Sequence, residues 1–193
     1  MPLKPGCNRS TFEGKAAWRE AIDFLMKQKP IHPLKLNQGL CLACQDHTAD
    51  MIKTGVTSHN SSDGSSFSDR IHRRCGKAYG SSGENISRDF LVEGRKHGLT
   101  SVMKLIIDDG TSSRGHRKNI FNEKFNYVGT DTKVINGKVI TVQDFHENNV
   151  GVDNNGEGNA TNIKANNSVP KNTGSNSSMK KDDILTKAVN QKK

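Results

Sequence analysis

The amino-acid composition changes abruptly after Val150, and this change limits how much of the chain can form a core. Residues 151–193 consist mainly of Asn, Gly, Ser, Thr and Lys and contain no aromatic residue. A segment of this kind cannot bury enough apolar surface to offset the entropy lost on ordering it. We therefore predict one folded domain at residues 15–147, with an irregular lead-in at 1–14 and a disordered tail at 148–193.

The first half of this domain carries helical periodicity. Trp18 and Ile22 belong to an apolar series with a spacing of three and four residues, which predicts a helix over residues 15–28. The same reasoning predicts a second helix over 37–53 and a short helix of about two turns over 67–75.

The second half is less regular. Residues 76–83 are rich in Gly and Ser, so we expect a turn that presents Glu84 at a fixed angle. Residues 87–99 are charged and show no period, which favours a surface excursion. Thr100 is a suitable N-cap for an apolar helix that ends at Gly110, leaving two aspartates in the last turn.

A hairpin is expected near the end of the domain. Residues 127–134 and 138–145 are rich in β-formers and are separated by Asn136-Gly137. The Asn-Gly pair strongly indicates a tight primed turn, because both residues tolerate a positive φ.

The formal net charge of +9 is spread along the chain and does not gather in one basic patch with interleaved aromatics. We therefore expect no nucleic-acid partner. The chain has no run of about 18 apolar residues, so no transmembrane segment is expected. The opening residues are too polar for a signal peptide.

The chain has four cysteines, at positions 7, 41, 44 and 75. Cys41 and Cys44 form a C-x-x-C within a helical pattern, without a second such pair. We interpret them as small packing residues or as part of a disulfide set. His47 lies on the apolar face of the same helix, which favours a hydrogen-bonded structural role over metal ligation.

The candidate functional residues are two histidines and three acids, namely His59, Glu84, Asp108, Asp109 and His116. Neutral imidazole and carboxylate are donors that hold a borderline metal such as zinc. They are also groups that move protons in hydrolysis. Only a folded domain can bring together residues so widely spaced in the sequence.

An ordered series of motifs resembles the CAP superfamily, or SCP domains, which includes cysteine-rich secretory proteins, antigen 5 and plant pathogenesis-related class 1 proteins. The matching pieces extend over residues 16–146 and are ACQDHTADM (43–51), Ser58-His59, SDGSS (62–66), Asp69-Arg70-Ile71, Gly83-Glu84-Asn85-Ile86, Ile107-Asp108-Asp109-Gly110 and Gly115-His116-Arg117-Lys118-Asn119-Ile120-Phe121. The Gly-His-Arg sequence is similar to the bacterial and protist branch of the family.

The resemblance implies an α+β fold, a three-layer α-β-α sandwich in which two histidines and two acids meet in a cleft. Carried over to this chain, His59 and His116 are the histidines and Glu84 is one acid. The other acid is Asp108 or Asp109, because the register is ambiguous by one residue. The resemblance also implies an extracellular protein whose cleft binds a divalent metal such as zinc and, in some members, sterol or other lipid.

Three functions follow as hypotheses. The first is a non-enzymatic binding module with a zinc site of modest affinity, since two histidines are fewer ligands than a tight site uses. The second is a metal-assisted hydrolase or protease in which His59, His116 and Glu84 activate water. The third is a structural or host-interaction module with a vestigial site, in which Arg114 and Arg117 pair with Asp108 or Asp109. The oligomeric state is left open by the sequence.

Overall fold

The computed structural model describes residues 11–151. Its helices and strands are, in chain order, α1 (Lys15–Lys27), β1 (Lys35–Leu36), α2 (Gln38–Thr54), α3 (Phe67–Cys75), β2 (Ser82–Phe90), α4 (His97–Ile107), α5 (Gly115–Ile120), β3 (Tyr127–Ile135) and β4 (Lys138–His146). The predicted tail at 148–193 lies outside the described residues, apart from its first four positions, as does most of the predicted lead-in.

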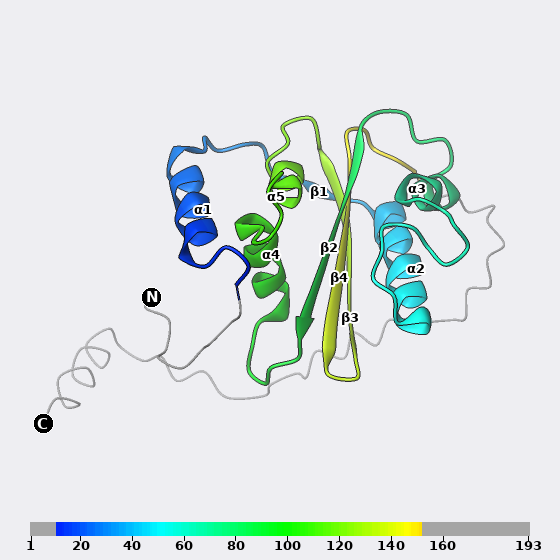
Figure 1. The fold of residues 1–193 in the computed structure, drawn as a ribbon. Helices are drawn as coiled ribbons and strands as arrows, with labels where there is room; N and C mark the ends of the chain where they lie inside the picture. Colours follow the sequence, from blue (N-terminus) through cyan, green and yellow to red (C-terminus); the bar gives the residue numbers. More distant parts are fainter. Residues whose placement is uncertain (1–10, 152–193) are drawn as a thin grey trace, which may run out of the picture. The chain divides into compact units, whose positions relative to one another are not determined.

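The described elements form a three-layer α-β-α sandwich, as predicted. The sheet has the strand order β1-β3-β4-β2, with β1 parallel to β3 and the other pairs antiparallel. Figure 1 shows α2 and α3 on one face of the sheet and α1, α4 and α5 on the other. Because side chains of a strand alternate between faces, neighbouring residues of β2 point into different helical layers.

The side of the sheet facing α2 holds one apolar cluster of the core. Cys44 and Met51 of α2 pack there against Ile140 and Val142 of β4. Close contact between α2 and the sheet requires Gly129 on β3, because a Cβ atom there would lie 2.2 Å from the carbonyl carbon of Leu40. No real Cβ contact is that short, so a side chain at this position would push α2 away from the sheet.

Most predicted elements are confirmed. The first three helices begin and end within one residue of the predicted limits. The hairpin turn has φ values of 48° at Asn136 and 72° at Gly137, both in the left-handed region that a primed turn needs.

The segment between α3 and α4 differs from the prediction. Residues 87–90 are not a surface excursion but the second half of β2, and Glu84 lies on that strand and not in a turn. The strand pairs with β4 from Ser82 to Phe90, and this pairing outweighs its charged composition. An edge strand tolerates charged side chains because one long side of it is not paired with another strand.

The helix after this strand begins at His97, not at Thr100, and its N-cap residue Lys96 makes no side-chain capping bond. The aspartates do not lie in its last helical turn either. Asp108 is the C-cap, with a left-handed φ of 56°, and Asp109 follows it. The short elements β1 and α5 were not predicted, because two and six residues are too few to show a period.

We predict that Gly129→Ala destabilises the fold by about 1–3 kcal/mol, the usual cost of overpacking a well-filled interior. Urea denaturation followed by circular dichroism measures this change. The matched control is Gly98→Ala in α4, where a Cβ would meet nothing within 4 Å. The control should leave stability unchanged or raise it by up to about 1 kcal/mol, since Ala is the better helix former. Equal effects of the two substitutions would contradict the close contact.

Candidate functional site

The first half of the site is centred on Glu84. One carboxylate oxygen of this buried residue accepts a hydrogen bond from Nδ1 of His59 at 2.7 Å. The other oxygen pairs with the guanidinium of Arg70, which is 1% exposed. Arg70 is itself held by the carbonyl oxygen of His59 at 3.1 Å and by Ser61 Oγ at 3.1 Å. Glu84 therefore connects β2, α3 and the loop that carries His59.

The orientation of that loop also depends on His47. Its ring is fully buried, and its Nε2 lies 2.7 Å from the carbonyl oxygen of Ser58, the residue before His59. Burial, followed by the nearby positive charge of Arg70, holds the pKa of His47 below its ordinary value. His47 is thus a hydrogen-bonded structural residue, as predicted from its place on the apolar face of α2.

The second half of the site is centred on Asp108. One of its oxygens lies 2.6 Å from Nδ1 of His116, and the other accepts the backbone N–H of His116 at 2.9 Å and that of Arg117 at 3.3 Å. Burial by itself raises the pKa of Asp108, but the hydrogen bonds and the charge interaction with His116 outweigh it and lower the pKa below its ordinary value. One carboxylate therefore holds both the ring and the backbone at the start of α5.

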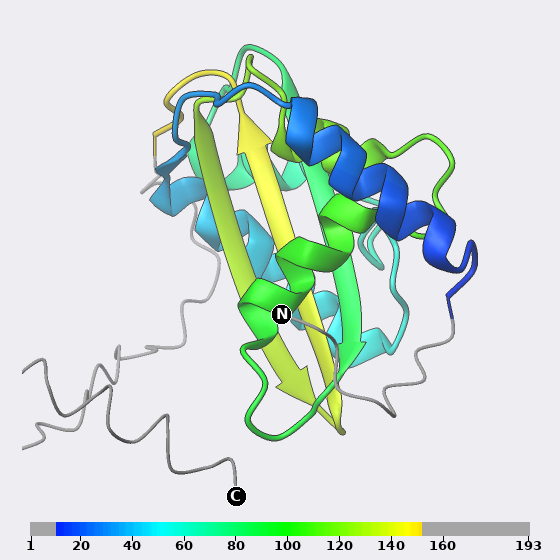
Figure 2. The same ribbon diagram turned by 90° about the vertical axis from the view of Figure 1, so that its left-hand side faces the viewer.

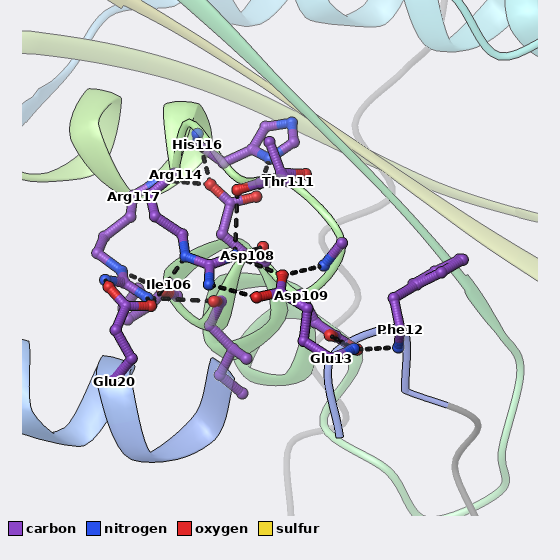
Figure 3. A network of polar contacts seen from close by, with 12 residues as sticks. Phe12, Glu13, Glu20, Ile106, Asp108, Asp109, Thr111, Arg114, His116 and Arg117 are labelled. Carbon is purple, nitrogen blue, oxygen red and sulfur yellow. Dashed lines mark hydrogen bonds and ion pairs between the residues drawn. The ribbon is translucent and has the colours of Figure 1, made fainter. Parts of the chain in front are cut away.

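The neighbouring Asp109 points elsewhere (Figure 3). Its two oxygens accept the backbone N–H groups of Phe12 and Glu13 at 3.0 and 2.9 Å. The structure therefore brings Asp108, and not Asp109, to a histidine. Asp109 ties the residues before α1 to the end of α4.

The two arginines flanking His116 bind α1, so the pairing with Asp108 or Asp109 that the third hypothesis assumed is wrong. Arg114 makes ion pairs with Glu13 at 2.7 Å and with Glu20 at 2.8 Å, while Arg117 reaches Glu20 at 2.6 Å. Arg114 contacts only the backbone of Asp108, because its guanidinium donates to the carbonyl oxygen at 2.8 Å. Arg117 contacts the Asp108 carboxylate only through its own backbone N–H, which donates at 3.3 Å. Figure 3 shows this network between α1 and the turn after α4.

The two halves meet along the edge strand β2. Asn85, the residue after Glu84, donates its side-chain amide to the carbonyl oxygen of His116 at 3.1 Å. Asn119 donates to the carbonyl oxygen of Glu84 at 3.2 Å and to Oδ1 of Asn85 at 2.9 Å. His59 is therefore bound to Glu84, and the backbone of His116 to the next residue, Asn85. These two strand residues direct their side chains to opposite faces of the sheet.

Two buried charged residues near the site had no role in the sequence analysis. Arg70 carries the Glu84 ion pair, and its only sequence signal was its place beside Ile71 in a family motif. Asp144 is the cross-strand neighbour of Glu84 on β4 and is fully buried. Burial, followed by the negative charge of Glu84, raises the pKa of Asp144 well above its ordinary value.

The C-x-x-C cysteines do not form a disulfide. Cys41, Cys44 and Cys75 are free and buried, and Cys7 lies outside the described residues. Burial raises the pKa of Cys75 to about 11 and that of Cys44 above its ordinary value, so both remain thiols near neutral pH. They serve as packing residues in the core.

The arrangement leaves one nitrogen of each imidazole available. Both Nδ1 atoms are engaged by carboxylates, and within residues 11–151 no hydrogen bond reaches Nε2 of His59 or His116. A carboxylate on one ring nitrogen is the usual support for a histidine that binds a metal through the other. Across the same residues, no group of three or more His, Cys, Asp or Glu side chains is placed to hold a metal ion. The donors on offer are therefore two imidazoles.

Comparison with known families decides the classification. The model of the CAP family, described as the cysteine-rich secretory protein family, matches residues 16–145. The chain belongs to the CAP family. The match covers α1 through nearly all of β4, so the α-β-α sandwich described above is the CAP domain. No curated protein matches the chain.

Three solved structures show what this CAP domain is similar to. An extracellular protein containing a SCP domain from Bacillus anthracis shares 26% identity over 61% of this chain and 35% of its own, with a TM-score of 0.47. An outer surface protein from Borrelia burgdorferi shares 14% identity over 70% of this chain and 88% of its own, with a TM-score of 0.49. A cysteine-rich secretory protein from Staphylococcus aureus shares 18% identity over 61% of this chain and 33% of its own, with a TM-score of 0.40. The match thus spans about a third of the Bacillus and Staphylococcus chains.

We predict that His59 and His47 titrate on opposite sides of the ordinary histidine pKa of 6.5. The hydrogen bond from Glu84 raises the pKa of His59 despite partial burial, whereas burial lowers that of His47. Histidine-resolved NMR titration of the CAP domain measures both. Glu84→Gln should lower the pKa of His59 and leave His47 below its ordinary value.

The shifted pKa of His59 makes the stability of the fold depend on pH. Because the pKa of His59 is raised in the folded state, its pairing with Glu84 stabilises the fold fully at a pH below the unfolded-state pKa. This stabilisation is lost as the pH rises through the folded-state pKa. A pKa for His59 at or below that of His47 would contradict the pairing.

Proposed function

We propose that this CAP domain is a non-enzymatic, secreted binding module that holds a divalent metal such as zinc between His59 and His116. The observation that supports the proposal is that each Nδ1 is held by a buried carboxylate, which turns Nε2 outward as the metal-binding atom. Glu84 and Asp108 then orient the imidazoles and are not themselves ligands. Asp109 takes no part, because both of its carboxylate oxygens accept backbone N–H groups from the residues before α1.

The donor set suits a weak site. Structural zinc sites use four protein ligands and catalytic sites three, so two imidazoles leave the remaining positions to water. A bound zinc ion would act as a Lewis acid on such a water. A zinc ion with only two protein ligands and water in its other positions should bind with modest affinity and reversibly. Because the imidazoles must be neutral to bind, we expect affinity to fall as the solution is acidified.

Isothermal titration of the full chain with zinc chloride at pH 7 tests this proposal. We expect one site that is abolished in the His59→Ala/His116→Ala double variant. Glu84→Gln and Asp108→Asn should each weaken binding by about 10–100-fold, the usual effect of removing a carboxylate behind a metal-binding histidine.

The matched control removes two other histidines. His72 and His97 bond to backbone groups of their own neighbourhoods. The His72→Ala/His97→Ala variant should bind zinc as the parent chain does. Equal loss in both double variants, or no binding by the parent chain, would contradict a site at His59 and His116.

A second candidate function rests on a cavity between α1 and α4. It has a volume of about 670 Å³ and is lined by Trp18, Ile22, Met103 and Ile107, with four basic residues around it, Lys15, Arg19, Arg95 and Lys104. Ile22 and Met103 are 56% and 46% exposed, unusual for large apolar side chains facing one another. An apolar cavity with a cationic rim suits a single-chain amphiphile with an anionic head, such as a fatty acid.

Trp18 provides the test, because it is the chain's single tryptophan and lines the cavity. We expect spin-labelled stearate to quench the fluorescence of Trp18 saturably. Met103→Glu should reduce the affinity at least about tenfold, since a carboxylate in the cavity repels the anionic head and would lose its hydration beneath the bound ligand. The matched control is Leu25→Glu, because Leu25 is 45% exposed, close to the 46% of Met103, and lies on α1 outside the cavity lining. Quenching that is unaffected by Met103→Glu would contradict binding there.

Secretion is part of this proposal. The Bacillus and Borrelia proteins are described as extracellular and outer surface proteins, respectively. Within residues 11–151, no helix has the length and apolar character that crossing a membrane requires.

A further inference from the structure

One edge of the sheet is open. The strand β3 has β4 on one side, but on the other side β1 covers only Tyr127 and Val128. The remaining residues up to Ile135 have no strand beside them among the described elements. Figure 2 shows β3 as the outermost long strand of the sheet. An edge of this length is a template for pairing with another strand.

The direction of the backbone groups follows from the ladder on the paired side. The carbonyl oxygen of Val128 points away from β4, because it accepts the N–H of Asn37 at 2.9 Å. Since successive residues of a strand direct their backbone groups to alternate sides, Thr130, Thr132 and Val134 also direct theirs away from β4. These three residues are exposed, while those between them are partly buried. The open edge therefore presents three N–H and three C=O groups.

The side chains along this edge are complementary to themselves. Asp131 and Lys133 lie on the α2 face of β3, with 13% and 41% of their side chains exposed, and within one chain they form an ion pair at 3.7 Å. Thr48 of α2 also donates a hydrogen bond to Asp131. If a second β3 runs antiparallel and the two-fold axis passes beside Thr132, each Asp131 lies opposite Lys133 of the other copy. The outward-pointing residues then pair with one another, Thr132 with Thr132 and Thr130 with Val134. In this register every hydrogen-bonded position of the ladder is used.

Charge selects this arrangement over the alternatives. A parallel, in-register pairing would place Asp131 beside Asp131 and Lys133 beside Lys133, and like charges directly opposite are destabilising. A lysine by itself would be a common protection of an edge against pairing. The aspartate two residues earlier converts that protection into a preference for an antiparallel copy of the same strand.

The other edge of the sheet is not available for the same contact. Side chains from the α4–α5 layer occupy outward-facing carbonyl groups of β2, since Asn119 binds that of Glu84 at 3.2 Å and Lys104 that of Arg88 at 2.8 Å. Pairing through β3 therefore closes after two copies and does not continue into a fibre.

We propose that two copies of this chain associate through the open edge of β3, antiparallel and with the two-fold axis at Thr132, to form one continuous sheet. The contact is short and lies below the size of a standard protein interface, so we expect reversible association at high protein concentration. The proposal is independent of metal or lipid binding by the CAP domain.

Sedimentation equilibrium of the full chain, from about 10 μM to about 1 mM, tests the association, a range suited to a small interface. We expect a monomer–dimer equilibrium that Thr132→Pro shifts at least about tenfold towards monomer, because proline lacks the outward N–H and its ring obstructs the second strand. Thr132→Ala keeps the N–H and should still dimerise. A chain that stays monomeric throughout, or a dimer that Thr132→Pro leaves intact, would overturn the proposal.

Charge reversal gives a test that stands even if the proline variant does not fold. Lys133→Asp places acids opposite acids and Asp131→Lys places lysines opposite lysines, so each variant alone should be monomeric. A mixture of the two restores both ion pairs and should form heterodimers. Circular dichroism establishes that each variant is folded. Dimerisation of either folded variant alone, or its absence in the mixture, would refute pairing in this register.

Discussion

The buried ion pair between Arg70 and Glu84 is the interaction on which the arrangement of the site depends. Both side chains are 1% exposed, so each has lost its hydration and is compensated by the other. Removing one partner of such a pair typically costs about 3–5 kcal/mol, because the remaining charge is left buried and unpaired. The remaining oxygen of Glu84 then holds His59. The same contact that joins α3 to β2 therefore sets the orientation of one candidate ligand.

The second histidine is held by a different principle. His116 begins a short helix whose backbone and ring are both bound by Asp108, a residue in the left-handed conformation. The turn between them is fastened to α1 by Arg114 and Arg117 through Glu13 and Glu20. Displacement of α1 would thus reach His116 through this network, and α1 also forms one wall of the apolar cavity. The two candidate binding regions share a supporting element.

Much of the fold was predictable because the signals are local. Helical periodicity located α1 and α2, and Asn136-Gly137 located the hairpin within a residue. The second half of β2 was missed because its charged residues carry no alternation, and its strand conformation comes from pairing with β4. For the candidate site, the sequence pointed to the histidine and acid positions, but it assigned no role to Arg70 or Asp144. A charged residue in a sequence looks solvent-exposed until its burial is known.

The sequence by itself determined the family, the order of the main elements and the set of residues from which a site can be built, since these depend on motifs and short-range spacing. The tertiary structure alone decided that Asp108 and not Asp109 meets His116 and that Arg114 and Arg117 bind α1. It also decided that, among the described elements, β1 covers only the first two residues of the outer edge of β3. These facts depend on which residues far apart in the chain become neighbours. Two adjacent aspartates are chemically identical, and only the direction of the backbone between them separates their partners.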